Sequence, residues 1–164
     1  MLDHFDHVHA SPPCQQYSRA KTKGVRDLFS ADAISEKALA IRYFSTAAYS
    51  IENPCGGKYT LEKRGILDDL PRYLITYCKF ESPLHPYRKP TSIWTNLSVQ
   101  FPLPCSKAAR CDFFLAGDGK HHPKSAQRGT QNNYIDASNG LHQLHSMPPN
   151  LCRIIATAAS ALQH

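Results

Sequence analysis

Two short apolar stretches, each followed by proline and a reactive side chain, constrain this chain more than any other feature. The first covers residues 5–10 and leads through Ser-Pro-Pro to Cys14. The second is centred on residues 49–51 and leads to Glu52, which Asn-Pro follows. Both read as strands, so a thiol and a carboxyl are predicted just beyond two strand ends, the edge at which open α/β sheets bind ligands.

The segment between these strands has the pattern of a helix. Asp32 is its N-cap candidate, and apolar residues follow at roughly helical spacing: Ile34, Ala38, Ile41, Phe44 and Ala48. Further strands are predicted over residues 74–80 and 93–95, and a short helix over residues 61–70, ended by Pro71. Alternating strands and helices predict an α/β fold with a three-layer core, a sheet with flanking helices.

Composition divides the chain into three parts. Residues 1–101 carry the alternating pattern. Residues 102–147 are rich in Gly, Asn, His, Ser and Lys without a clear period, which predicts a loop-rich basic segment for target recognition or metal binding. Residues 148–164 begin with two prolines and read as a C-terminal helix that packs back on the core.

The net charge and the cysteines indicate the kind of binding partner and the cellular compartment of this chain. The chain of 164 residues carries a formal charge of +6, which favours a polyanionic partner. An ordinary solvated basic surface is the alternative. We find no signal peptide and no stretch that could span a membrane. The six cysteines are therefore interpreted as thiols in a reducing, intracellular compartment, with cytoplasm and nucleus left open.

Three motifs in a fixed order carry a resemblance. They are Ser-Pro-Pro-Cys-Gln at residues 11–15, Ile-Glu-Asn-Pro at 51–54, and Tyr-Arg-Lys-Pro-Thr-Ser-Ile-Trp-Thr-Asn at 87–96. The set resembles the DNA (cytosine-5) methyltransferases, especially their compact phage-like and virus-like branch, and the resemblance extends through residues 126–129 to 147–151. It implies a partial Rossmann-like methyltransferase fold, with residues 1–101 as its catalytic half.

The resemblance also implies roles for residues. Cys14 would be the nucleophile that adds to carbon 6 of cytosine, Glu52 the acid at ring nitrogen 3, and Asn53 would shape the pocket. The methyl donor would be S-adenosylmethionine, next to Pro12 and Pro13. The substrate would be double-stranded DNA, with the target base flipped out of the stack.

Two departures from the family pattern change these expectations. Only thirteen residues precede Cys14 and none is glycine, whereas the family places a Gly-rich donor turn there. We therefore expect the donor site to be largely missing, and a separate donor-binding chain is one way to supply it. Secondly, Ser92 occupies the position of an arginine that contacts the cytosine oxygen, which leaves Arg88 as the nearest substitute.

The segment after Cys14 is basic, and the resemblance implies that it is a mobile loop that closes on DNA. An ordinary solvated loop is the alternative reading. The candidate DNA-binding residues are Gln15, Ser18, Arg19, Lys21, Lys23, Arg26 and Lys89.

Cysteine and histidine also cluster in the loop-rich segment. The spacing Cys105-x5-Cys111-x9-His121-His122 predicts a zinc site with Cys105, Cys111 and His121 as ligands, completed by Cys78 or His122. The alternative is buried free thiols and surface histidines.

The leading hypothesis is thus a shortened DNA cytosine-5 methyltransferase homologue. It would transfer a methyl group to carbon 5 of cytosine through a covalent cysteine adduct. The first alternative is a noncatalytic DNA-binding or partner-binding remnant of the same fold. An amino-methylating DNA enzyme is a weaker alternative, because such an enzyme needs neither the thiol nor the Glu-Asn-Pro motif. A zinc-binding interaction module is the fourth.

Overall fold

A computed structural model describes residues 5–18, 21–44, 47–116, 121–128, 134–135 and 145–163. The chain forms two compact units. The first comprises Met1–Leu74, Thr91–Gln100 and Ile155–His164, and the second comprises Ile75–Pro90 and Phe101–Ile154. Within the described ranges no helix is long and apolar enough to cross a bilayer.

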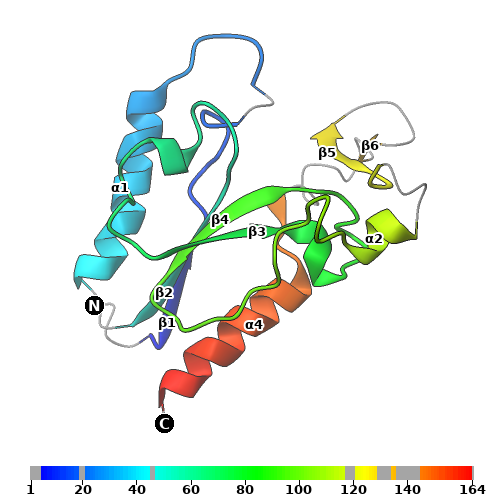
Figure 1. The fold of residues 1–164 in the computed structure, drawn as a ribbon. Coiled ribbons are helices and arrows are strands. Elements are labelled where there is room, and N and C mark those ends of the chain that lie inside the picture. The colour runs from blue at the N-terminus through cyan, green and yellow to red at the C-terminus, as the bar shows by residue number, and fades with distance from the viewer. Residues whose placement is uncertain are drawn as a thin grey trace. The chain divides into compact units, whose positions relative to one another are not determined.

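A four-stranded mixed sheet organises the chain (Figure 1). Its strands are β1 (His7–Ala10), β2 (Ala48–Pro54), β3 (Arg72–Thr76) and β4 (Pro90–Thr95), in the order β1-β2-β4-β3. Strands β1 and β2 are parallel, with Ala10 opposite Ile51, whereas β2 and β4 are antiparallel. The α/β class predicted from the sequence is confirmed. The three-layer, Rossmann-like arrangement stays a prediction.

The helix α1 (Leu28–Phe44) connects the two parallel strands. Asp27 caps it, since its carboxylate accepts a 3.0 Å hydrogen bond from the backbone N–H of Ser30. The prediction that Asp32 is the N-cap was therefore wrong. The first turn does not follow the buried helical pattern, because Phe29 in that turn is 87% exposed.

The core of the first unit lies between α1, β2, β4 and the connection that precedes β3. Its buried members are Tyr17, Ala31, Ala38, Tyr49, Ile51, Leu61, Leu67, Leu70 and Trp94. The helix contributes only alanines to this buried set. Small side chains let its backbone approach the strands closely, while the large residues of β2 and β4 fill the core.

Two predicted elements are shorter than expected. Only a 3-10 turn, η1 (Leu61–Lys63), forms in the expected helix, and Gly65 follows it with φ +75°, a conformation that no helix continues. Strand β3 gives way at Tyr77 to the 3-10 helix η2 (Tyr77–Phe80). Glu81, in the left-handed region at φ 51°, ends η2.

The remaining elements follow β4. They are α2 (Asp112–Leu115), β5 (Ser125–Arg128), β6 (Tyr134–Ile135), α4 (Pro149–Ser160) and η3 (Ala161–Gln163). The predicted helix after the double proline is confirmed by α4. It buries Leu151, Ile155 and Ala159, which share one face because they are four residues apart.

Candidate functional site

The Cys14 segment is joined directly to strand β2. The side-chain amide of Asn53 donates a 2.8 Å hydrogen bond to the backbone carbonyl of Pro12. Asn53 is 1% exposed and its neighbour Glu52 is 6% exposed, whereas Cys14 is partly exposed. Because β1 and β2 run parallel, the chain leaves both strands at the same edge of the sheet. The thiol-bearing turn and the carboxyl-bearing strand therefore belong to one local structure.

The backbone at Cys14 is also fixed on its other side. Its carbonyl accepts hydrogen bonds from the N–H groups of Tyr17 at 3.0 Å and Ser18 at 2.8 Å, which closes a tight turn. The Tyr17 side chain is 1% exposed, and its hydroxyl donates to Asp32 on α1 and contacts Ser35, each at 3.0 Å. Burial raises the pKa of Tyr17 to about 12. Tyr17 thereby anchors the turn to α1.

Asp32 is itself held by an ion pair. The Arg64 guanidinium donates to both of its carboxylate oxygens, at 2.6 Å in the shortest contact. The hydrogen bond from Arg64 is the main cause that lowers the pKa of Asp32, and the hydroxyl of Tyr17 adds to it. The chain of contacts from Tyr17 through Asp32 to Arg64 links the turn after Cys14 to the segment that precedes β3.

Sequence reasoning missed two histidines beside this edge. His7 and His9 are two residues apart in β1, so their side chains point to the same face of the sheet. Both rings contact the Ser50 hydroxyl, His7 at 3.0 Å and His9 at 2.7 Å. Burial lowers the pKa of His9, and the nearby charge of Glu52 partly opposes that effect. The spacing of two residues in a strand was the signal that could have revealed the pair.

Ser92 lies opposite Asn53 in the antiparallel register of β2 and β4. It is fully buried, and neither its Oγ nor the Oδ1 of Asn53 has a nitrogen or oxygen partner within the described residues. The Ser92 hydroxyl lies near the thiol of Cys55, a weaker interaction. Burial raises the pKa of Cys55 to about 11, while the contact with Ser92 acts in the opposite direction. Buried oxygens without a nitrogen or oxygen partner are uncommon in folded proteins.

Arg88 lies in the second unit, where its Nε donates a 3.1 Å hydrogen bond to the carbonyl of Cys105. Its predicted contact with the cytosine oxygen stays a prediction. The residue of β4 that lies opposite Asn53 in the strand register is Ser92.

Arg26 has a structural role in the basic loop. Its guanidinium donates to the carbonyls of Gln16, Ser18 and Lys21, at 3.0 Å to Ser18 and 2.6 Å to Lys21. It also lies 4.7 Å from the centre of the Tyr59 ring. These contacts close the loop that follows Cys14.

The other predicted DNA-binding residues are placed differently. Gln15 and Lys23 are exposed, and Lys21 is half-buried. The ammonium of Lys89 lies 4.4 Å over the Tyr77 ring. Arg19 falls outside the described residues. Close to Lys23, two large apolar side chains are exposed, Val25 at 94% and Phe29 at 87%.

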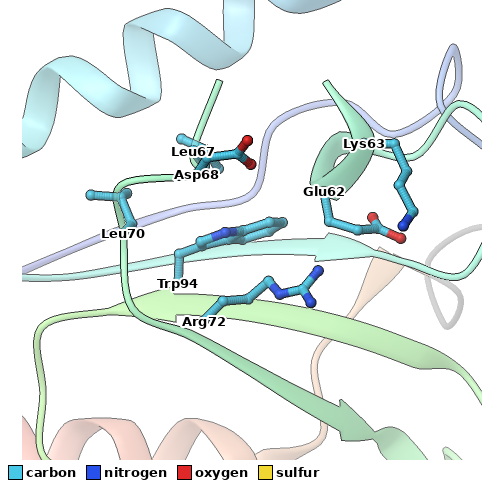
Figure 2. A pocket seen from close by; sticks show the side chains of 7 residues that line it. All are labelled: Glu62, Lys63, Leu67, Asp68, Leu70, Arg72 and Trp94. Carbon is cyan, nitrogen blue, oxygen red and sulfur yellow. The ribbon is translucent and has the colours of Figure 1, made fainter. Parts of the chain in front are cut away.

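A separate cavity of about 260 Å³ lies in the first unit (Figure 2). Its lining residues are Glu62, Lys63, Leu67, Asp68, Leu70, Arg72 and Trp94. None of the predicted catalytic residues lines it, so we assign it no role.

In the second unit, three cysteines and one histidine converge: Cys78, Cys105, Cys111 and His122. Their sulfur and nitrogen atoms all lie within 4.8 Å of one another. The predicted ligand His121 is exposed and is not a member. The histidine that turns toward the sulfurs is His122, and Cys78 joins from η2. The two residues that the sequence left as alternatives for a fourth ligand are thus both present.

Burial dominates the electrostatics of this group. It raises the pKa of the thiols of Cys78 and Cys111 and lowers the pKa of the His122 imidazole. None of the three sulfurs in this group is held in a disulfide.

Comparison with known proteins gives one relative of note. Over 120 residues the chain is 27% identical to a protein of Frog virus 3 (isolate Goorha) named "Probable DNA (cytosine-5)-methyltransferase". The match covers 65% of this chain and 53% of the viral protein, so the chain spans about half the length of that relative. No protein-family model matches the chain.

Proposed function

We propose that this chain carries the nucleophile-bearing part of a DNA cytosine-5 methyltransferase. The observation that carries the proposal is the hydrogen bond from Asn53 to the Pro12 carbonyl. It binds the turn with Cys14 to the strand with Glu52. Similarity to the viral protein supports the same reaction class.

Cys14 and Glu52 have complementary tasks in this reaction. The Cys14 thiolate forms a bond to carbon 6 of cytosine, and the electron pair of the C5–C6 double bond moves into the ring. Glu52 delivers a proton or hydrogen bond to nitrogen 3, which neutralises the charge that develops there. Carbon 5 thereby becomes nucleophilic. Asn53 positions the thiol through the Pro12 carbonyl.

Pro12 and Pro13, the residues predicted to lie next to the methyl donor, do not form a donor site. Pro12 is buried with its carbonyl bonded to Asn53, and Pro13 is exposed, so neither forms a cradle for a nucleoside. S-Adenosylmethionine would supply the methyl group in such an enzyme, and we derive no step through it here. Residues outside the described ranges or a separate chain would have to hold it. The outer edge of β1 has no strand partner among the described residues, and an unpaired edge can accept a further strand. This open edge is where a donor-binding part would add.

Double-stranded DNA is the proposed substrate, with its target base flipped out of the stack. The exposed Lys23 is well placed for a phosphate. Val25 and Phe29, exposed nearby, resemble the apolar wedges that some proteins insert between base steps. Arg26 supports the loop from inside.

A covalent-adduct assay tests the proposal without a methyl donor. Duplexes of randomised sequence would carry pyrimidin-2-one in place of cytosine, because this ring accepts a thiolate at carbon 6 more readily. Wild-type chain should form a DNA–protein adduct that survives a denaturing gel. Cys14→Ser should form none, whereas the controls Cys55→Ser and Cys152→Ser should keep it. Absence of an adduct with wild type, or its persistence in Cys14→Ser, would overturn the proposal.

A noncatalytic DNA-binding role is the second candidate, and one observation favours it. Ser92, and not an arginine, faces Asn53. The same assay separates the two functions, since a noncatalytic binder would retain DNA affinity and give no adduct.

A further inference from the structure

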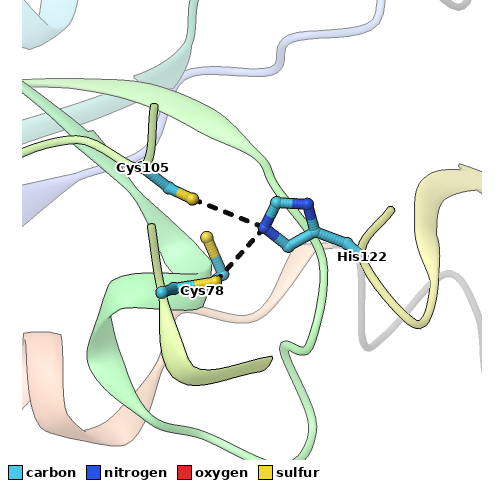
Figure 3. A group of neighbouring side chains, drawn as sticks. Cys78, Cys105 and His122 are labelled. Atoms are coloured by element: carbon cyan, nitrogen blue, oxygen red, sulfur yellow. Dashed lines mark hydrogen bonds between the residues drawn. The ribbon is translucent and has the colours of Figure 1, made fainter. Parts of the chain in front are cut away.

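Four side chains from three separate segments meet in the second unit (Figure 3). Cys78 comes from η2, Cys105 and Cys111 from the stretch that leads to α2, and His122 from the segment after it. No element of regular structure spans all three segments. Something other than backbone hydrogen bonding has to hold them together.

The distances within the group match those around a tetrahedral zinc ion. Bonds of about 2.3 Å to sulfur and about 2.0–2.1 Å to nitrogen set the ligands about 3.6–3.8 Å apart at their corners. The Nε2 of His122 lies 3.6 Å from the sulfur of Cys105 and 3.3 Å from that of Cys111. The widest pair in the group is within 4.8 Å. Adjustments of a few tenths of an ångström to about 1 Å would complete the coordination shell.

Hydrogen bonding alone accounts poorly for this convergence. Both sulfurs approach the same ring nitrogen of His122. A neutral imidazole offers either one proton or one lone pair at that atom, so it cannot make two good bonds there. A cation at the centre of the group would satisfy all four ligand atoms at once.

The three cysteines are buried together in a small cluster. The buried members of this cluster are Cys78, Cys105 and Cys111, each at most 3% exposed, with Phe113 and Phe114 packed against them. This cluster by itself buries little apolar surface, and a metal ion is a common way to stabilise such a region.

Neighbouring residues hold the ligands in place. The Phe114 ring packs edge-on against the His122 imidazole, with 5.4 Å between centroids. The N–H of Cys105 donates to the Thr76 hydroxyl at 2.8 Å, and its carbonyl accepts from Arg88. Such supporting contacts fix ligand direction before a metal arrives.

Positive charge near the group complements this ligand set. Three thiolates and a neutral histidine around Zn²⁺ leave one net negative charge. Arg88 bonds to the backbone of Cys105, and the ammonium of Lys79 donates to the carbonyl of Arg110 at 2.8 Å, next to Cys111. The nearby cations favour the anionic, metal-bound state.

We propose that Cys78, Cys105, Cys111 and the Nε2 of His122 form a closed, structural zinc site that fastens three segments of the second unit. Three thiolates and an imidazole suit zinc, and four protein ligands leave no open position for catalysis. The site is thus separate in role from Cys14, and the adduct chemistry can fail without affecting it.

Metal content is measured first, on untagged full-length chain purified from a medium that supplies zinc, iron, cobalt and nickel. Native mass spectrometry and elemental analysis should find about one zinc per chain. Replacement by Co²⁺ should give the intense visible bands of tetrahedral cobalt with thiolate ligands. Iron in place of zinc, no bound metal, an octahedral cobalt spectrum, or a disulfide between two of the three cysteines would each overturn the proposal.

Matched variants then test the ligand set. Cys105→Ser and His122→Ala should lose zinc to a chelator more than about tenfold faster than wild type. The controls His121→Ala and Cys152→Ser alter an adjacent histidine and an exposed cysteine outside the group, and should retain zinc like wild type. Equal loss in His121→Ala and His122→Ala would refute the assignment. The wild-type cobalt spectrum decides the matter if a ligand variant does not fold.

Discussion

Asn53 donates its side-chain amide to the carbonyl of Pro12 over 2.8 Å, and this bond connects β2 to the turn that presents Cys14. Both groups are buried. A buried carbonyl that loses its donor keeps the cost of desolvation, which is why one hydrogen bond can control both the stability and the position of the thiol.

Asn53→Ala should therefore destabilise the chain by about 1–3 kcal/mol and lower the rate of adduct formation by a larger factor than stability explains. Urea unfolding and the pyrimidin-2-one adduct assay measure the two effects. Asn150→Ala is the matched control, because its amide makes a similar 3.0 Å bond to the Phe80 carbonyl. The control should lose stability and keep the adduct rate. An adduct rate unchanged in Asn53→Ala would show that the bond does not position Cys14.

The Tyr17 hydroxyl should make stability depend on alkaline pH. Its pKa in the folded chain is raised to about 12 from its ordinary value of 10.0. A raised pKa means that the folded state holds the proton longer than the unfolded state, so the contribution is complete below pH 10 and declines as pH rises towards 12. Unfolding curves between these limits should fall more steeply for wild type than for Tyr17→Phe. Equal slopes would contradict the assignment. Other buried tyrosines contribute equally to both proteins.

Lys23 and Arg26 should behave as a contrasting pair. Lys23→Ala removes an exposed charge, so DNA affinity should fall, the salt dependence should decrease by about one phosphate contact, and the melting temperature should stay constant. Arg26→Ala removes the donor to three backbone carbonyls, so it should loosen the loop after Cys14. Limited proteolysis should then cut that loop faster in Arg26→Ala alone. Identical behaviour of the two variants would show that Arg26 is a surface charge.

Local patterns made the strand–helix–strand unit and the final helix predictable. Apolar runs ended by proline marked β1 and β2, and the double proline marked the start of α4. The Asn53–Pro12 bond and the serine opposite Asn53 could not be found in this way, because each depends on the register between distant strands. Periodicity over residues 61–70 predicted a helix that Gly65 prevents.

The cysteine–histidine group could also be predicted only in part from the sequence. Spacing in the sequence drew attention to Cys105 and Cys111, but the choice between two adjacent histidines depends on which ring turns inward. Cys78 lies 27 residues before Cys105, and only the folded chain brings the two together. Sequence separation of that kind carries no spacing signal.

The last prediction concerns Ser92, where a substitution should lower the stability of the chain and raise the rate of adduct formation. Ser92 is fully buried opposite Asn53, and its hydroxyl lacks a nitrogen or oxygen partner in the described part of the chain. Ser92→Ala should therefore change stability by less than about 1 kcal/mol, since no strong hydrogen bond is lost.

Ser92→Arg should lower stability, because a long guanidinium enters a packed position and lacks a partner until the base arrives. Once the ring is bound, that guanidinium can donate a charge-assisted hydrogen bond to its oxygen, worth about 1.5–3 kcal/mol. We expect adduct formation in Ser92→Arg to be about tenfold to a hundredfold faster, with DNA affinity nearly unchanged because the phosphates are not involved. Urea unfolding, adduct rates and DNA titration measure the three quantities on each variant. Arg88→Ala is the control for the competing assignment: a loss of adduct rate there, with no gain in Ser92→Arg, would give the role to Arg88.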